Sequence, residues 1–312
     1  MLIQIQFLKI VSVLAQQLKC SESDILKLIL NAPYKYRVYS IPKRTHGRRI
    51  IAQPTKAVKE LQRSYLKYKD FPFHTNSMAY RKGFSIKDNA ESHRLSAYLL
   101  KMDLANFFNS LTPDVFWDIW RQHWEPLQSL EHRLVENILF WDNSGKLMLS
   151  VGAPSSPAIS NFCLYFFDNA VSEYCEKINV IYTRYADDLT FSCNDPNILP
   201  TLPEFISRVL KEKFSGKILV NHQKTIFSSK AHNRHVTGIT ITNDEKLSIG
   251  RYRKRYIKHL INQYKYNLLD TEAIYHLKGM ISFSNHIEPD FLNSLRKKYS
   301  SNLIDEIIEV NK

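Results

Sequence analysis

Cysteine is scarce in this chain, and the few that occur do not stand in a metal-binding pattern. Four are present among the 312 residues: Cys20, Cys163, Cys175 and Cys193. No two of them form a C-x-x-C pair, which argues against a structural zinc site. So few cysteines fit a reducing compartment better than an oxidising one, so we expect a cytoplasmic location.

Long apolar runs are also missing. No stretch reaches the roughly 18 apolar residues that indicate a membrane-spanning helix. The apolar opening of the chain is interrupted by Gln4, Gln6 and Lys9, and it carries no basic leader. It therefore lacks the pattern of a secretion signal. We expect no membrane span and no secretion.

Acidic residues are outnumbered, with 30 Asp and Glu against 43 Lys and Arg and a net charge of +13. Ten cations and a single acid, Glu60, fall between Lys35 and Lys67. Residues 251–265 hold six cations, three tyrosines and no acid. Cations neutralise phosphates and aromatic rings stack on unpaired bases, so this clustering favours a nucleic-acid partner. A solvated basic surface is the alternative.

The most informative stretch that is present is Tyr185-Ala186-Asp187-Asp188, inside the β-rich run of residues 180–192. Apolar residues on both sides predict two strands with the acids at their junction. Two carboxylates so close repel each other, and a divalent cation removes that penalty. Hard oxygen ligands suit Mg²⁺, so the pair predicts a magnesium site. A helix cap or a surface turn is the alternative.

A second acid ends another predicted strand. Residues 99–102 are largely apolar, Asp103 follows them, and an aromatic pair stands at Phe107 and Phe108. A strand that delivers Asp103 beside Asp187 and Asp188 would bring together three carboxylates. Three carboxylates can hold two Mg²⁺ ions about 3.5–4 Å apart for phosphoryl transfer.

Together the two segments resemble the palm of reverse transcriptases. Asp103 matches the family's first catalytic aspartate, and the motif ending in Asp187 and Asp188 matches the second. The resemblance implies that Asp103 and Asp187 bridge two Mg²⁺ ions, with Mn²⁺ as a possible substitute. It implies supporting parts for Asp188 and for the backbone of Leu104. Phe108 matches the aromatic gate that selects deoxynucleotides in that family.

The resemblance narrows to the retron reverse transcriptases of bacteria. Residues 89–93 match their Asn-Ala-x-x-His element, residues 236–238 match Val-Thr-Gly, and residues 152–154 match Gly-Ala-Pro. These elements occur in the family's order, and the resemblance covers residues 35–285 or so. One departure is Val151, where the family usually has a glutamine that contacts the incoming nucleotide.

The resemblance also implies residues that contact substrates. The expected nucleotide-binding residues are Lys43, Arg49, Phe108, Gly152 and Lys224. The expected RNA- or primer-binding residues are Asn89, His93, Val236, Thr237, Gly238, Arg251, Arg253, Lys254, Arg255 and Lys258. Three alternatives stay open from the residues alone. Lys43 and Arg49 could be solvated strand-edge charges, and Asn89 and His93 could have structural roles.

The expected architecture is an α+β right-hand polymerase fold with fingers, a palm of antiparallel sheet on helices, and a helical thumb. We assign residues 1–33 to an N-terminal helical segment and residues 34–98 to the fingers with a retron-specific insertion. Residues 99–245 form the expected palm, with part of the fingers at 113–157, and residues 246–312 the thumb. A hairpin across residues 34–54 and helical structure across residues 113–142 are also predicted.

The implied function is RNA-directed DNA synthesis. The resemblance implies that the enzyme copies part of a structured noncoding RNA into single-stranded DNA branched from a guanosine 2′-OH. It also implies dNTP substrates, an effector protein as partner and a role in defence against phage. Another bacterial class, such as a group II intron-like or diversity-generating reverse transcriptase, is one alternative, and a noncatalytic RNA-binding scaffold is another. The oligomeric state is not indicated.

Overall fold

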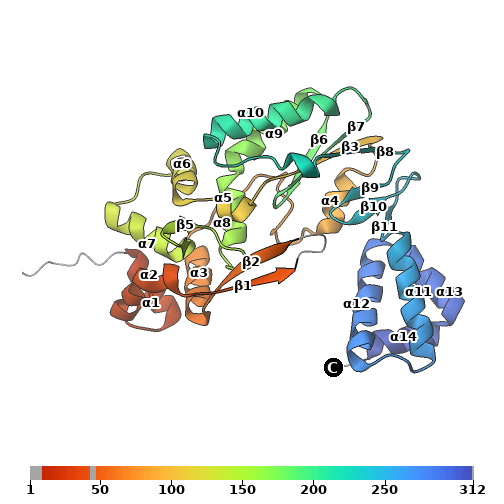
Figure 1. Ribbon diagram of the computed structural model, residues 1–312. Helices are drawn as coiled ribbons and strands as arrows, with labels where there is room; N and C mark the ends of the chain where they lie inside the picture. The colour runs from red at the N-terminus through yellow and green to blue at the C-terminus, as the bar shows by residue number, and fades with distance from the viewer. Residues whose placement is uncertain (1–8, 43–46, 311–312) are drawn as a thin grey trace, which may run out of the picture. The chain divides into compact units, whose positions relative to one another are not determined.

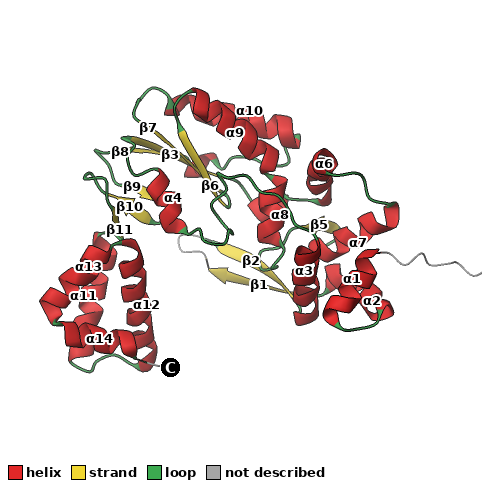
Figure 2. Cartoon of the chain, turned by 180° about the vertical axis from the view of Figure 1, so that it is seen from behind, coloured by secondary structure: helices red, strands yellow, loops and turns green. Residues whose placement is uncertain are grey.

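The computed structural model describes residues 9–42 and 47–310, which form helices and short sheets (Figures 1 and 2). The chain divides into two compact units. The first comprises residues 1–80, 102–189 and 200–225, and the second comprises residues 81–101, 190–199 and 226–312. The division passes through two strands, β3 (Tyr98–Asp103) and β7 (Asp188–Cys193). Each unit is therefore built from segments that are distant in sequence.

The first unit opens with helices α1 (Lys9–Leu18) and α2 (Glu22–Asn31). Ser21 caps the start of α2, because its hydroxyl accepts a hydrogen bond of 3.1 Å from the backbone N–H of Asp24. The apolar stripe of α1, which includes Ile10 and Leu14, is buried. Helix α1 packs on α3 (Lys56–Tyr68) and on α2, so these helices share one core.

The predicted hairpin is confirmed, since β1 (Tyr36–Pro42) pairs antiparallel with β2 (Arg48–Pro54). The tip of the hairpin lies outside the described residues. Most of β1 is exposed, whereas Ala52 on β2 is buried. The N–H of Ala52 donates a 3.0 Å hydrogen bond to the carbonyl of Val151, which joins the hairpin to the segment before Gly152.

An aromatic core fills the middle of the first unit. Phe116, Trp120 and Phe162 surround Phe71 with ring centroids 6.0, 6.3 and 5.1 Å away, the separations at which aromatic rings pack edge to face. Phe116 and Trp120 are themselves buried. In this part of the first unit the chain forms α5 (Phe107–Ser110), α6 (Pro113–His123), α7 (Ser129–Leu139), β4 (Trp141–Asn143), β5 (Lys146–Met148) and α8 (Ser156–Cys163).

The helical structure predicted across residues 113–142 is present as two helices, and the last residues of the segment form β4. Helix α6 ends at His123 and α7 begins at Ser129, with Pro126 between them. Proline lacks the N–H that a continuing helix requires, and it restricts the residue before it. The chain turns instead, and the indole of Trp120 donates to the carbonyl of Glu125 at 3.0 Å within this turn.

A four-stranded sheet carries the acidic residues. Its strand order is β6 (Ile181–Tyr185), β7, β3 and β8 (Ile226–Ser229). Helix α9 (Tyr165–Lys177) packs against β6 and against α10 (Leu202–Phe214). Two 3₁₀ turns, η2 (Leu199–Thr201) and η3 (His222–Lys224), flank α10 in sequence. Strands β3 and β7 are largely buried, whereas Ile226 and Phe227 on β8 are exposed.

The second unit joins a small sheet to a helical bundle. The sheet contains β9 (Arg234–Val236), β10 (Ile239–Ile241) and β11 (Leu247–Ser248), and it contacts α4 (Ile86–Ser92). The bundle consists of α11 (Arg251–Lys265), α12 (Thr271–Ile287), α13 (Pro289–Tyr299) and α14 (Ser301–Glu309). Ile257, Leu277 and Ile281 belong to its core. Across residues 9–42 and 47–310, no helix is long and apolar enough to cross a membrane.

Candidate active site

Asp187 lies at the tip of a tight hairpin. Strand β6 ends at Tyr185 and β7 begins at Asp188, so Ala186 and Asp187 alone form the connection. Ala186 adopts a left-handed φ of 58° and is buried. An L-residue in this region carries a penalty of roughly 1–2 kcal/mol. The surrounding structure must therefore hold the turn in this strained shape.

Asp103 lies beside this turn and is held there through the backbone. It ends β3 and is 7% exposed. The next residue, Leu104, donates its N–H to the carbonyl of Asp187 at 3.0 Å. On the other side, the N–H of Asn221 donates to the carbonyl of Asp103 at 2.7 Å. These hydrogen bonds bring together two of the three predicted carboxylates.

The two carboxylates influence each other electrostatically. Burial raises the pKa of Asp187, and the negative charge of Asp103 raises it further, while its own backbone hydrogen bond, Lys224 and Arg49 act in the opposite direction. Lys224 Nζ lies 2.8 Å from Asp103 Oδ2. This hydrogen bond raises the pKa of Lys224. A lysine ammonium thus offsets the negative charge between these acids.

The expected convergence of three acids needs correction. Within the described ranges, no three Asp, Glu, His or Cys side chains are gathered closely enough to hold a metal ion. Asp188 opens β7 and is exposed, because successive residues of a strand point to opposite faces. Asp103 and Asp187 still supply hard oxygen donors. The charge of Asp103 is balanced by Lys224, whose side chain is 61% exposed. Carboxylate oxygens are ligands that divalent cations such as Mg²⁺ prefer, so the two acids fit such an ion.

A cavity of about 380 Å³ lies in the same unit. Phe108 and Gly152, both predicted to contact a nucleotide, line it together with Tyr80, Lys59 and Arg63. The rings of Tyr80 and Phe108 lie 6.5 Å apart. Burial raises the pKa of Tyr80 to about 12, and the negative charge of Asp187 adds to this shift. The acidic turn therefore acts electrostatically on this wall of the cavity.

Gly152 permits a close approach of two backbone segments. Its φ is 125°, a region that L-residues rarely adopt. A Cβ atom there would lie 3.2 Å from the carbonyl oxygen of Ala52 and 3.3 Å from Cγ2 of Ile51. Strand β2 therefore packs directly against this edge of the cavity. On the same strand, Arg49 is exposed and lowers the pKa of Asp187, whereas Lys43 lies outside the described residues.

The Val-Thr-Gly element forms the turn between β9 and β10. Thr237 and Gly238 have φ values of 46° and 79°, the pattern of a type I′ hairpin turn. A left-handed φ is unusual for a β-branched residue such as Thr237. Its hydroxyl donates to the carbonyl of Ile86 at 3.1 Å, and the amide of Asn89 lies 3.5 Å from that hydroxyl. Two sequence elements 148 residues apart thus support each other.

Asn89, His93 and Val236 are each 0% exposed. The Nδ1 atom of His93 lies 2.7 Å from the hydroxyl of Ser192, and burial lowers the histidine pKa to about 3. These side chains cannot touch RNA in this conformation. The expectation of RNA contact by these three side chains is corrected to a structural role that shapes the loop around Thr237.

Helix α11 presents its predicted cations unequally. Arg251 and Arg255 are exposed. Arg253 donates to the carbonyl of Gly238 at 2.7 Å, and Lys254 pairs with Glu288. The remaining cation of the set, Lys258, lies 5.7 Å from the ring centre of Phe291. Two of the five are therefore engaged in the fold, and the exposed arginines are the best placed to meet phosphates.

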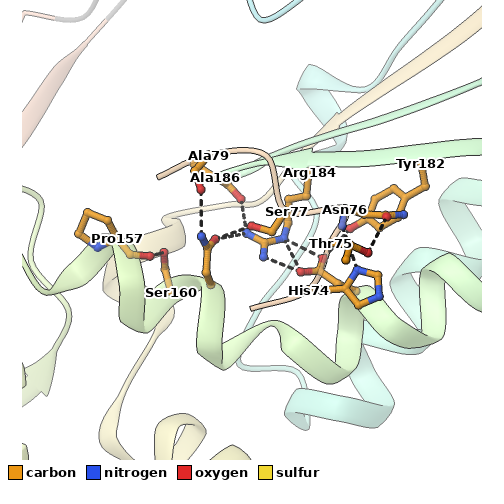
Figure 3. Close-up of polar contacts among 12 residues, drawn as sticks. His74, Thr75, Asn76, Ser77, Ala79, Pro157, Ser160, Tyr182, Arg184 and Ala186 are labelled. Carbon is orange, nitrogen blue, oxygen red and sulfur yellow. Dashed lines mark hydrogen bonds and ion pairs between the residues drawn. The ribbon is translucent and has the colours of Figure 1, made fainter. Parts of the chain in front are cut away.

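Sequence reasoning missed a buried ion pair next to the acidic turn. Arg184 on β6 and Asp168 on α9 are both 0% exposed, with Arg184 Nη2 2.6 Å from Asp168 Oδ2. Figure 3 shows Arg184 beneath Ala186. A charged residue inside an apolar strand was the available signal, because such a residue needs a buried partner. Tyr80, on the cavity wall, was also missed.

Protonation of His93 predicts a pH dependence of stability. Its pKa is about 3 in the folded protein and near 6.5 when unfolded, so only the unfolded chain gains this proton below about pH 6.5. The contribution is complete above that pH and is lost as the pH falls. When the pH falls from 7 to 5, the free energy of unfolding should decrease by about 2 kcal/mol more for the wild-type protein than for His93→Asn, as measured by denaturant titration. Equal losses would contradict the buried neutral histidine.

Replacement of Gly152 tests the close approach to β2. Gly145 serves as a matched control, because its φ is 85° but nothing lies within 4 Å of its added Cβ. Gly145→Ala should lower the free energy of unfolding by about 1 kcal/mol through backbone strain alone. Gly152→Ala adds overpacking, so we expect a loss of about 2–4 kcal/mol. Equal losses in denaturant titrations would contradict the proposed contact.

Comparison with known proteins identifies the family. Residues 41–241 match the family model described as reverse transcriptase (RNA-dependent DNA polymerase). The chain is 44% identical over 278 residues to the retron Ec83 reverse transcriptase of Escherichia coli, covering 87% of this chain and 89% of that protein. It is 30% identical over 303 residues to the retron Ec86 reverse transcriptase of E. coli, covering 92% and 90%.

The retron Mx65 reverse transcriptase of Myxococcus xanthus is 28% identical over 281 residues, covering 84% of this chain and 64% of that protein. These matches and the mixed helices and sheets confirm the expected α+β right-hand polymerase fold. They also favour the retron class over the other bacterial classes considered. The chain belongs to the retron reverse transcriptases and is an RNA-directed DNA polymerase.

Proposed function

We propose that Asp103, Asp187 and Asp188 are the catalytic carboxylates of this polymerase. Asp103 and Asp187 would hold two Mg²⁺ ions, for which Mn²⁺ could substitute, with Asp188 and the backbone of Leu104 in support. One observation carries this proposal. The hydrogen bond from Leu104 N–H to the Asp187 carbonyl sets the end of β3 directly beside the acidic turn.

Bound divalent ions would activate the primer hydroxyl and stabilise the charge on the transferred phosphoryl group and the pyrophosphate. The protein's own part is to hold its acids close together. Lys224 now pairs with Asp103. With a divalent ion on that carboxylate, the exposed ammonium would be free to contact a phosphate oxygen. Arg49, which influences Asp187 from β2, would contact the triphosphate with Lys43.

We assign the cavity of Phe108 and Gly152 to the incoming dNTP. The aromatic wall formed by Phe108 and Tyr80 would leave little room for a ribose 2′-OH, which would favour deoxynucleotides. The Gly152 backbone would approach the nucleotide closely. Val151 cannot offer the side-chain hydrogen bond that glutamine offers in related enzymes. This contact is therefore absent from our assignment.

We also propose the domain assignment expected from the sequence: N-terminal segment 1–33, fingers 34–98, palm 99–245 with part of the fingers at 113–157, and thumb 246–312. In the thumb, Arg251 and Arg255 are exposed on α11 beside Tyr252, which is 81% exposed. Exposed cations beside an aromatic ring suit RNA phosphates and unpaired bases. The turn of Thr237 and Gly238 would lie near the primer end, with Arg253, Lys254 and Lys258 supporting it.

We further propose the retron reaction itself. The enzyme would recognise a structured noncoding RNA, prime from a guanosine 2′-OH and copy part of that RNA into branched single-stranded DNA. It would act with an effector protein in defence against phage. Membership of the retron family supports this part of the proposal.

Substitution of Asp187 tests the catalytic assignment. Asp187→Asn should lower dNTP incorporation by at least about a thousandfold, because the loss of a metal ligand removes several kcal/mol of transition-state stabilisation. RNA binding should stay within a few fold. Asp195→Asn is the matched control, since it makes the same change at an exposed acid beyond β7. We expect it to retain incorporation.

The same variants report on the product. Each protein is expressed with the native flanking DNA, and its copurified nucleic acid is divided by RNase and DNase. Wild type and Asp195→Asn should carry a discrete single-stranded DNA joined to RNA, whereas Asp187→Asn should carry RNA alone. Incorporation by Asp187→Asn would contradict the catalytic assignment, and unbranched DNA from wild type would contradict the retron reaction.

A further inference from the structure

The buried pair of Arg184 and Asp168 is linked to the acidic turn, because Arg184 also donates a hydrogen bond to the carbonyl of Ala186 (Figure 3). The guanidinium binds the carboxylate in a two-pronged manner, with Nε 2.8 Å from Oδ1 and Nη2 2.6 Å from Oδ2. The hydroxyl of Tyr182 donates to the same carboxylate at 2.7 Å. Both charged groups are fully buried, so the orientation of the guanidinium is fixed.

The remaining nitrogen of the guanidinium faces the turn. Arg184 Nη1 donates to the carbonyl oxygen of Ala186 at 3.1 Å and to Oδ1 of Asn161 at 3.2 Å. Ala186 is the residue with the left-handed φ, and Asp187 follows it. The carbonyl of Ala186 belongs to the peptide unit that leads into Asp187. A fixed donor there therefore sets the direction in which Asp187 leaves the turn.

The network also reaches the wall of the cavity. Asn161 Nδ2 donates to the carbonyl of Ala79 at 3.0 Å, and the hydroxyl of Ser77 donates to Asn161 Oδ1 at 2.7 Å. The backbone of Arg184 bonds this same segment, since its carbonyl accepts from Met78 at 2.8 Å. Tyr80 follows Ala79 and lines the cavity beside Phe108.

A stabilising role does not account for this arrangement. A buried ion pair is often no more stabilising than apolar side chains of similar size. An apolar pair could fill the space beneath the turn, but it could not bind the carbonyl of Ala186 or the amide of Asn161. One guanidinium can thus orient two parts of the polymerase, the acidic turn and the segment before Tyr80.

We propose that Arg184 and Asp168 form a positioning pair for catalysis. Arg184 orients Asp187 through the Ala186 carbonyl, and it orients Tyr80 through Asn161. The first arm rests on the proposed metal-binding role of Asp187, and the second rests on the dNTP cavity. Neither Arg184 nor Asp168 touches a reacting atom.

Arg184→Lys tests the first arm. Lysine keeps the positive charge opposite Asp168, but its single ammonium cannot also hold the Ala186 carbonyl in a fixed plane. We expect Mn²⁺ binding, followed by electron paramagnetic resonance without nucleotide, to weaken at least tenfold. Arg234→Lys is the matched control, because Arg234 is equally buried and also caps carbonyls, those of Ser96 and Thr242. Its Mn²⁺ affinity should be unchanged.

Thermal unfolding of both variants separates positioning from stability. If Mn²⁺ affinity falls only in Arg184→Lys while both variants are folded at the assay temperature, the first arm is supported. Wild-type affinity in Arg184→Lys would overturn it. Asp187→Asn provides the reference for lost metal binding. If wild type binds Mn²⁺ no better than Asp187→Asn, the proposed metal ligand is wrong, and the second arm decides the positioning role.

Asn161→Ala tests the second arm and also covers the case in which Arg184→Lys does not fold. This variant leaves the Arg184 bonds to Asp168 and Ala186 in place and cuts the link to Ala79. We expect the KM for dNTP to rise at least fivefold, with kcat within twofold and Mn²⁺ affinity unchanged. An unchanged KM would overturn the link between the ion pair and the cavity wall.

Discussion

The site depends on holding two negative charges close together in a partly buried place. Asp103 and Asp187 come from different strands, and their charges oppose each other. The fold resists this repulsion with backbone hydrogen bonds on both sides of Asp103 and with the Lys224 ammonium. A divalent cation would exploit the same arrangement. The two carboxylates repel each other, but both would be attracted to a bound divalent ion.

The strained turn at Ala186 needs buried polar groups to hold it in place. Ala186 carries a left-handed φ, and it is bonded from beneath by a guanidinium that no solvent reaches. Strained backbone persists only where neighbouring structure determines it more than once. Here the turn is held by Arg184 on one side and by Leu104 on the other. The same guanidinium reaches Asn161 and, through it, the segment before Tyr80.

Much of the site follows from local sequence. The β-rich run around Asp187 predicted a hairpin, and the apolar stretch before Asp103 predicted a strand that ends in an acid. Both are present, because strand periodicity and turn chemistry act over a few residues. The hairpin of residues 36–54 followed for the same reason. The helical structure expected across residues 113–142 is interrupted around Pro126, because proline cannot continue a helix.

Contacts between distant segments could not be predicted in this way. The burial of His93 depends on Ser192, which lies 99 residues further along the chain. In the sequence, Arg184 is one of many cations in a basic protein. Only the fold shows that α9 places Asp168 against it. Such pairings depend on tertiary packing, which a periodic pattern does not specify. Family resemblance indicated that the Asn-Ala-x-x-His element matters, but only the packing assigns it a structural role.

The central claim is that Asp103 and Asp187 share divalent metal. Anomalous X-ray scattering from crystals of the protein soaked in Mn²⁺ tests it most directly, because the signal marks the metal without any assumption about activity. We predict a peak between the carboxylates of Asp103 and Asp187, with the Lys224 ammonium displaced from Asp103. Manganese bound elsewhere, with Lys224 still paired to Asp103, would contradict the account.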